Sequence, residues 1–250
     1  MTVFRASNAR VSSRATVVGL SLVVALAACG SGVTGEPQAS TPSATPSTTP
    51  GATITPFAYS TEPVPIEPGN YRIPKSAWSV VDFTITFPED WTAQYGHVYA
   101  SNPDQDDEFG FYAVVVDAIY ADACVGDAGG LMEIGPSVDD LADALLEQPG
   151  PEASGPIDTT LGGYPAVRID LKVPQGFDLN VCNLEGIGLQ IWYSAPADKY
   201  FVLLADGVAS VYILDVDGER QVFMTQHQST TSDEDLAELQ TVLDSIQIES

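Results

Sequence analysis

The sequence predicts an α+β fold, built mainly on an antiparallel β-sheet with two or three flanking helices. Three observations support this class. Several short segments alternate apolar and polar side chains with period two, tight-turn signals join neighbouring segments, and two segments open with helix caps. Regular strand–helix–strand alternation, which would favour a parallel sheet, is not seen. Residues 78–250 therefore form one globular domain in this interpretation, long enough to bury a core.

About eight strands are expected in this segment. The run 109–119 is apolar on both faces, as in a central strand. Residues 167–173 alternate, with Arg168, Asp170 and Lys172 outward as a charge ladder on a solvated sheet face. The predicted strands are 82–87, 95–100, 109–119, 167–173, 187–194, 200–204, 208–216 and 220–227.

Turns and helix caps punctuate these strands. Gly162-Gly163 forms a tight turn, and Asp217-Gly218 is the strongest hairpin signal in the chain. Ser137 precedes acidic residues and a leucine-rich run, which predicts a capped helix. Ser232 opens a second helix, whose Leu236, Leu239, Leu243 and Ile246 share one face.

The N-terminus has the pattern of an export signal. Arg5, Arg10 and Arg14 precede an almost wholly apolar run at 16–28, which is short for the roughly 20 residues of a membrane span. The run ends in Leu-Ala-Ala-Cys, which resembles the lipobox of bacterial lipoproteins. That resemblance implies that residues 1–28 are removed and that the Cys29 sulfur carries a diacylglyceryl (palmitate-type) anchor. An ordinary secretory signal with a chance cysteine is the alternative.

The segment that follows is predicted to be a tether. Of residues 30–56, 23 of 27 are Thr, Pro, Ser, Gly or Ala, a composition that buries little apolar surface. Prolines recur among aromatic residues over 57–75. Residues 29–77 are thus expected to hold the lipid anchor and a disordered stalk, with the globular domain beginning at 78.

Several motifs together resemble surface lipoproteins of high-GC, actinobacterial-type bacteria. These are the lipobox, the Thr/Pro stalk, Phe-Pro-Glu-Asp-Trp at 87–91, Gly-Gly-Tyr-Pro at 162–165, Asp-Val-Asp-Gly at 215–218 and the closing leucine-rich helix. The order of elements over residues 71–250 also resembles the PsbP-like α/β/α fold. Because these motifs are turns and caps, the resemblance transfers no functional residue.

Charge narrows the classes of partner. The chain has 34 acidic and 9 basic residues and a formal net charge of −25. Such a surface does not displace the counterions of a phosphate backbone, which excludes a sequence-independent nucleic-acid binder. It also gives no attraction to anionic lipid, so the chain is expected to bind the membrane only through its N-terminal lipid, on the extracytoplasmic face.

Two cysteines remain after Cys29. Cys124 and Cys182 are expected to form one disulfide in an oxidising compartment, and two separate buried thiols are the alternative.

The densest acidic cluster is a candidate calcium site. Asp104, Asp106, Asp107 and Glu108 supply several oxygen ligands from one loop, although Phe109 stands where an EF-hand loop needs glycine. A solvated acidic loop is the alternative.

Trp91, Trp192 and Tyr193, with Tyr95, are candidates for a ligand pocket or a sugar-stacking platform, and core packing is the alternative.

No catalytic residue or cofactor is assigned. Gly-x-Ser-x-Gly and His-Glu-x-x-His are absent, and only His97 and His227 are present. The sequence favours a membrane-anchored, non-catalytic binding module with an envelope protein, a small molecule or a glycan as its ligand. The alternatives are a carboxylate-dependent hydrolase of envelope glycans and a structural or chaperone-like envelope component.

Overall fold

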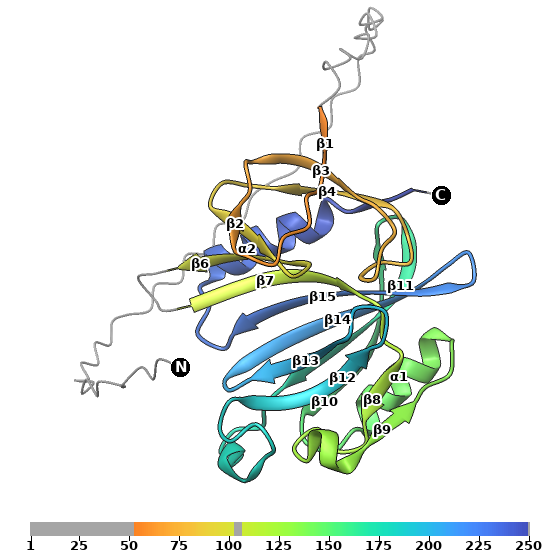
Figure 1. The fold of residues 1–250 in the computed structure, drawn as a ribbon, viewed down its shortest axis with the longest axis vertical. Coiled ribbons are helices and arrows are strands. Elements are labelled where there is room, and N and C mark those ends of the chain that lie inside the picture. The colour runs from red at the N-terminus through yellow and green to blue at the C-terminus, as the bar shows by residue number, and fades with distance from the viewer. Residues whose placement is uncertain (1–52, 103–106, 250) are drawn as a thin grey trace, which may run out of the picture. The chain divides into compact units, whose positions relative to one another are not determined.

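The computed structural model describes residues 53–102 and 107–249 (Figure 1). The predicted signal, Cys29 and residues 30–52 of the predicted tether lie outside these residues, whereas residues 53–77 are described and contain three short strands. An eight-stranded antiparallel sheet forms the centre of the described fold. In spatial order its strands are β10 (Glu152–Leu161), β11 (Tyr164–Lys172), β14 (Gly207–Val216), β15 (Glu219–Gln228), β7 (Asp107–Val114), β6 (His97–Asn102), β5 (Trp91–Gln94) and β2 (Val64–Pro65).

Two four-stranded sheets accompany the central one. The first consists of β1 (Ile54–Pro56), β3 (Gly69–Ile73), β4 (Phe83–Phe87) and β16 (Gln247–Ile248), and its β1–β3 pair is parallel. The second consists of β13 (Lys199–Leu204), β12 (Gly188–Ser194), β8 (Ala118–Tyr120) and β9 (Leu131–Glu133). The helices are α1 (Val138–Glu147), α2 (Asp233–Asp244) and two 3₁₀ turns, Gly126–Gly129 and Leu179–Val181.

The central sheet is buried on both faces because alternate side chains of its strands enter two different cores. On β14, Val211 and Ile213 pack with α1 and the β12–β13 sheet, while Tyr212 and Leu214 pack with α2 and the β3–β4 sheet. The figure shows the same order, with β1, β3, β4 and α2 on one side of the central sheet and β12, β13, β8, β9 and α1 on the other (Figure 1). The fold is thus layered, and each outer layer is a small sheet with one helix beside it.

This layering corrects the predicted fold class. Strands account for 48% and helices for 15% of the described residues, so the fold is β-rich. The predicted α+β class with two or three flanking helices, and the α/β/α arrangement implied by the PsbP-like resemblance, are therefore wrong. The physical reason is that several strands have only two to five residues and lie in proline- or glycine-rich segments, such as Val64–Pro65 and Gly69–Ile73. Such strands form by pairing with distant partners, and so leave no period-two pattern of their own.

The predicted turns and caps are confirmed. Asp217 and Gly218 both have positive φ, 55° and 89°, and close the β14–β15 hairpin between paired Val216 and Glu219. Ser137 and Asp140 form a capping box on α1, and the Ser232 side chain accepts a hydrogen bond from the backbone of the first turn of α2.

The apolar run 109–119 divides between two sheets. Residues up to Val114 lie in β7 between β15 and β6, whereas Ala118 begins β8 in the outer sheet. At the crossing, Asp117 accepts a hydrogen bond from the backbone N–H of Ala195 at 2.8 Å. The prediction of a central strand therefore holds for its first half only.

The predicted disulfide is present. Cys124 and Cys182 are bonded, with 4.6 Å between their Cα atoms, and Asn183 donates a backbone hydrogen bond to Cys124 at 2.8 Å. The bridge joins the segment after β8 to the segment before β12, and so ties together the connections that lead into the outer sheet.

Candidate functional site

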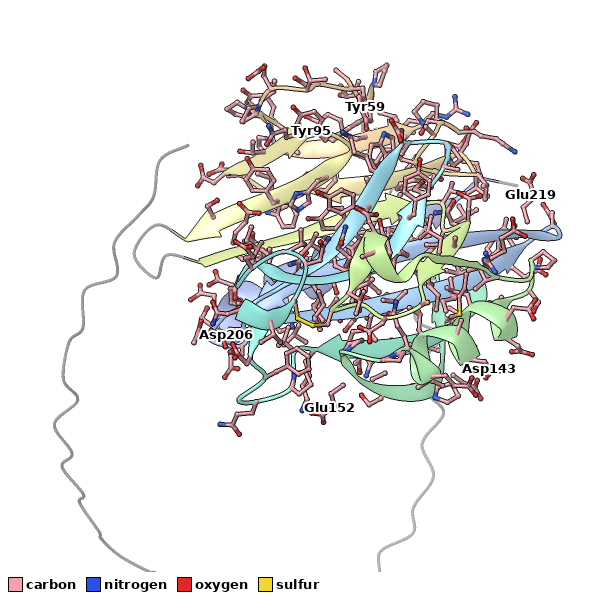
Figure 2. The ribbon with its side chains drawn as sticks, turned by 60° about the horizontal axis from the view of Figure 1, so that its bottom comes forward. Tyr59, Tyr95, Asp143, Glu152, Asp206 and Glu219 are labelled. Carbon is pink, nitrogen blue, oxygen red and sulfur yellow. A yellow bond between two sulfur atoms is a disulfide. The ribbon has the colours of Figure 1, made fainter. Side chains whose placement is uncertain are left out.

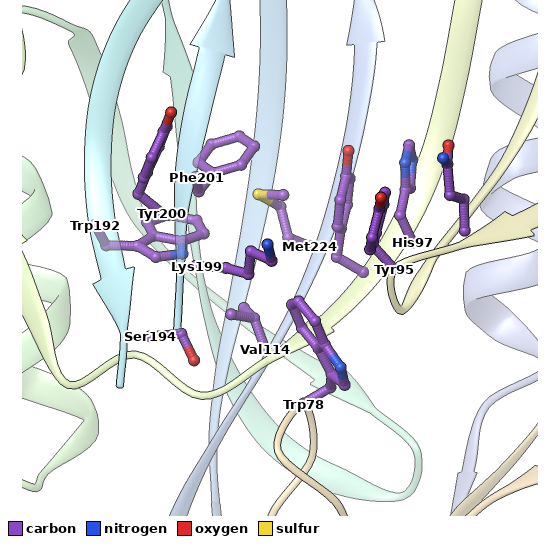
Figure 3. Close-up of a pocket in the computed structure, with 12 residues that line it drawn as sticks. Trp78, Tyr95, His97, Val114, Trp192, Ser194, Lys199, Tyr200, Phe201 and Met224 are labelled. Carbon is purple, nitrogen blue, oxygen red and sulfur yellow. The ribbon is translucent and has the colours of Figure 1, made fainter. Parts of the chain in front are cut away.

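A cavity of about 210 Å³ lies between the central sheet and the β12–β13 hairpin (Figure 3). One row of cross-strand neighbours forms its floor. Met224 on β15 pairs with Tyr112 on β7, which pairs with His97 on β6, which pairs with Gln94 on β5. Val114 lies two residues along β7 on the same face. The register of four strands, rather than any local motif, therefore builds this surface.

A β-bulge on β12 shapes the opposite wall. Gln190 pairs with Val202, but Trp192 pairs with Phe201, so β12 gains one residue at Ile191. The bulge leaves both Ile191 and Trp192 buried, at 0% and 1% exposure, on the side of the central sheet. The Trp192 ring stacks on Phe201 with 4.5 Å between centroids and an interplanar angle of 24°. The bulge thus turns a large aromatic side chain into the cavity wall.

Aromatic side chains from the N-terminal part of the described chain complete the rim. Trp78 lines this cavity and also a second one of about 330 Å³, on the other side of β6 and β7. Tyr59 stacks on Trp78 at 5.9 Å between ring centroids, and it lies near Tyr95 at one edge of the molecule (Figure 2). Gly96 has φ +78°, and a Cβ there would lie 2.9 Å from Trp78, so the β5–β6 turn needs glycine to admit the indole.

His97 is part of the apolar wall rather than an acid or base. Its ring stacks on Tyr112, 3.9 Å apart and 7° from parallel, and burial lowers the pKa of His97 to about 3. The imidazole is therefore neutral at physiological pH. It lies over Gly110, where a Cβ would come within 2.3 Å of Nε2.

Ser194 and Lys199 bring a hydroxyl and an ammonium to one side of the lining. The Ser194 hydroxyl is buried, with its side-chain oxygen lacking any hydrogen-bond partner among the described residues. The Lys199 ammonium is exposed and lies over the Tyr95 ring, 5.4 Å from its centroid. Figure 3 shows Lys199 reaching into the middle of the lining residues. Of the residues that line the cavity, none is an aspartate or a glutamate.

The structure separates the predicted aromatic candidates. Trp192 lines the cavity, and Tyr95 joins it there. Trp91 is fully buried in the other core, where its indole N–H donates to Glu238 Oε1 at 2.8 Å. Tyr193 is not among the lining residues, and its hydroxyl donates to Asp198 at 2.8 Å, which raises the pKa of Tyr193.

The other candidates lie partly or wholly outside the described residues. Of the calcium candidates, Asp104 and Asp106 lie outside the described residues, and Asp107 begins β7. Glu108 is exposed on the same strand. Across 53–102 and 107–249, no group of three His, Cys, Asp or Glu side chains could hold a metal ion. No helix in the same ranges is long and apolar enough to cross a membrane.

Sequence reasoning missed most of the cavity. Met224, Tyr112 and His97 are far apart in the chain, and only the strand register brings them together. Lys199 could have been singled out from the sequence, because it is one of only six basic residues after position 28. No feature of the sequence distinguishes Ser194 from the other serines of the chain.

Comparisons with known proteins give little further information. No protein-family model matches the chain, and no curated protein matches it. Among solved structures it is similar to LpqN, described as involved in cell envelope biogenesis of Mycobacterium tuberculosis, with a TM-score of 0.34 and 13% identity. That comparison covers 76% of this chain and 91% of LpqN. The cavity itself is therefore the main indication of function.

Proposed function

We propose that this chain is an extracytoplasmic lipoprotein, anchored through Cys29, that acts as a non-catalytic binding module for a small apolar ligand. The ligand site is the cavity between the central sheet and the β12–β13 hairpin. The anchor rests on the lipobox sequence, and the binding site rests on the cavity.

The observation that carries the proposal is an aromatic cavity with a buried, unpartnered hydroxyl. Apolar cavities with a few convergent polar groups are typical small-molecule sites. A buried hydroxyl without a partner costs about 1–3 kcal/mol, and a bound ligand that supplies the missing hydrogen bond would recover that cost. The volume of about 210 Å³ exceeds the roughly 150 Å³ cavity that holds a benzene ring.

The glycan-hydrolase alternative needs two carboxylates beside a sugar, and this cavity has none. Glu67, Glu89 and Asp90 do line a separate cleft next to Trp91. The Trp91 ring is fully buried there and so offers no stacking face. The cavity lined by Trp192 is thus the better-supported site.

Methionine methyl NMR tests the proposal. Met224 lines the cavity, whereas Met132 is 44% exposed on β9 and serves as an internal control. We expect toluene, added to the full chain in lipid nanodiscs, to shift the Met224 methyl resonance saturably and leave Met132 in place.

Val114→Phe should fill the cavity and abolish that shift. Val202→Phe, on the outward side of β13, is the matched control and should keep it. A Met224 signal that stays fixed in folded wild-type protein would refute the cavity as a binding site.

A further inference from the structure

We propose that the ligand is an amphiphilic carboxylate, whose apolar part fills the cavity and whose carboxylate lies between Ser194 and Lys199. This inference rests on the proposed binding function and adds the chemical class of the ligand.

Strand register places the two polar groups together. Ser194 on β12 is the cross-strand partner of Lys199 on β13, and both line the same cavity. Directly opposed residues on one sheet face have Cβ atoms about 5 Å apart. One group is a hydroxyl that lacks a hydrogen-bond partner, and the other is an ammonium with three N–H donors. A carboxylate has two acceptor oxygens and a charge, so it can engage both at once, whereas a neutral amide has a single carbonyl acceptor.

Lys199 also differs from every other basic side chain in the described ranges. The other five each contact a carboxylate or backbone carbonyls, as follows: Arg72 with Asp82 and Glu249, Lys75 with Glu219, Arg168 with Asp170, Lys172 with Glu152, and Arg220 with the carbonyls of Gly135, Ser137 and Val116. In a chain with 34 acidic residues, a lysine whose one contact here is the Tyr95 ring leaves its ammonium available to an incoming anion.

The neighbouring carboxylates have other partners. Asp198, next to Lys199, accepts the Tyr193 hydroxyl, and Asp117 accepts the backbone N–H of Ala195. Neither lines the cavity. Lys199 is therefore the charged side chain among the residues that line the cavity, and it is positive in a protein that is strongly negative as a whole.

The cavity accepts two shapes of apolar body. Its flat walls, Trp192 on Phe201 and His97 on Tyr112, suit an aromatic ring, and its volume also suits a short alkyl chain. An aryl carboxylate and an alkyl carboxylate share the same head-group chemistry, so both are used as probes.

The experiment compares matched probes on the full chain in lipid nanodiscs at neutral pH, with the Met224 methyl shift as readout. The probes are octanoate, octanamide, octylammonium and 3-phenylpropanoate. We expect octanoate or 3-phenylpropanoate to bind about tenfold more tightly than octanamide, because a hydrogen bond to a charged group is stronger than a neutral one. Octylammonium should bind more weakly than octanamide. The tighter of the two carboxylates identifies the shape of the apolar body.

Variants locate the effect. Lys199→Met should remove the preference for octanoate over octanamide while keeping the binding of octanamide. Ser194→Ala should reduce the preference for octanoate over octanamide. The fold should tolerate this substitution, because it removes a buried polar atom that has no hydrogen-bond partner among the described residues. Lys172→Met removes a lysine that is paired with Glu152 and should change nothing.

Equal affinity for octanoate and octanamide, with Met224 responding to both, would overturn the carboxylate assignment and leave the binding function intact. No response of Met224 to any probe would overturn both.

Discussion

Replacing His97 by glutamine should remove a large part of the pH dependence of folding stability. His97 stacks on the Tyr112 ring on the cavity floor and contacts the tilted Tyr99 ring, and burial lowers the pKa of His97 to about 3 in the folded protein. In the unfolded chain an imidazole titrates at about 6.5. The unfolded state therefore binds the proton first as the pH falls, and folding stability declines across this window.

The magnitude follows from the two pKa values. The stabilisation from a neutral His97 is complete above pH 6.5 and is lost progressively as the pH falls towards 3. Between pH 8 and pH 5 the free energy of unfolding should fall by about 2 kcal/mol through this group alone. Carboxylates titrate in both proteins and cancel in the comparison.

Urea denaturation with the disulfide intact measures the effect, at several pH values from 8 to 5. The wild-type protein should lose about 2 kcal/mol more than His97→Gln over that range. Parallel stability curves for the two proteins would show that the imidazole is solvated, and would refute the packed wall of the cavity.

Three further predictions concern the turn, the disulfide and the rim. Gly218→Ala should destabilise the fold by about 1–2 kcal/mol because φ at this residue is 89°. Asp217→Asn should change little in the same urea titration, since asparagine also suits this turn. Replacing Cys124 and Cys182 together by alanine should cost about 4 kcal/mol, from a closed loop of 58 residues, and a loss under 1 kcal/mol would contradict that estimate. Trp78→Ala should join the two cavities that this residue lines and move the binding preference from octanoate towards dodecanoate in Met224 titrations. An unchanged chain-length preference would show that the cavities stay separate.

Local chemistry made part of the fold predictable from sequence. The Asp217-Gly218 hairpin and the Ser137 and Ser232 caps depend on a few consecutive residues, and the structure confirms each. The sheet architecture depends on pairing between distant segments. The strand Gly69–Ile73 pairs with Phe83–Phe87 and adds its Tyr71 to the core, but five residues in a proline-rich context gave no periodic signal.

The candidate site was likewise predictable only where it depends on residue type, and not where it depends on the pairing of distant strands. Trp192 was found because a large aromatic residue stands out in a strand, but the bulge at Ile191 that turns it into the cavity has no sequence signature. Trp91 has the same residue type but lies in the opposite core, because β5 directs this side chain to the other face of the central sheet, whereas Gln94 of the same strand lines the cavity. Residue type alone therefore could not distinguish a cavity wall from a core position.

The most direct test of the account is the structure of the protein with octanoate bound, or with 3-phenylpropanoate if that binds more tightly. We expect the apolar part of the probe between Trp192 and Met224, with carboxylate oxygens about 3 Å from Ser194 Oγ and Lys199 Nζ. A probe bound elsewhere, or an empty cavity at saturating concentration, would contradict it.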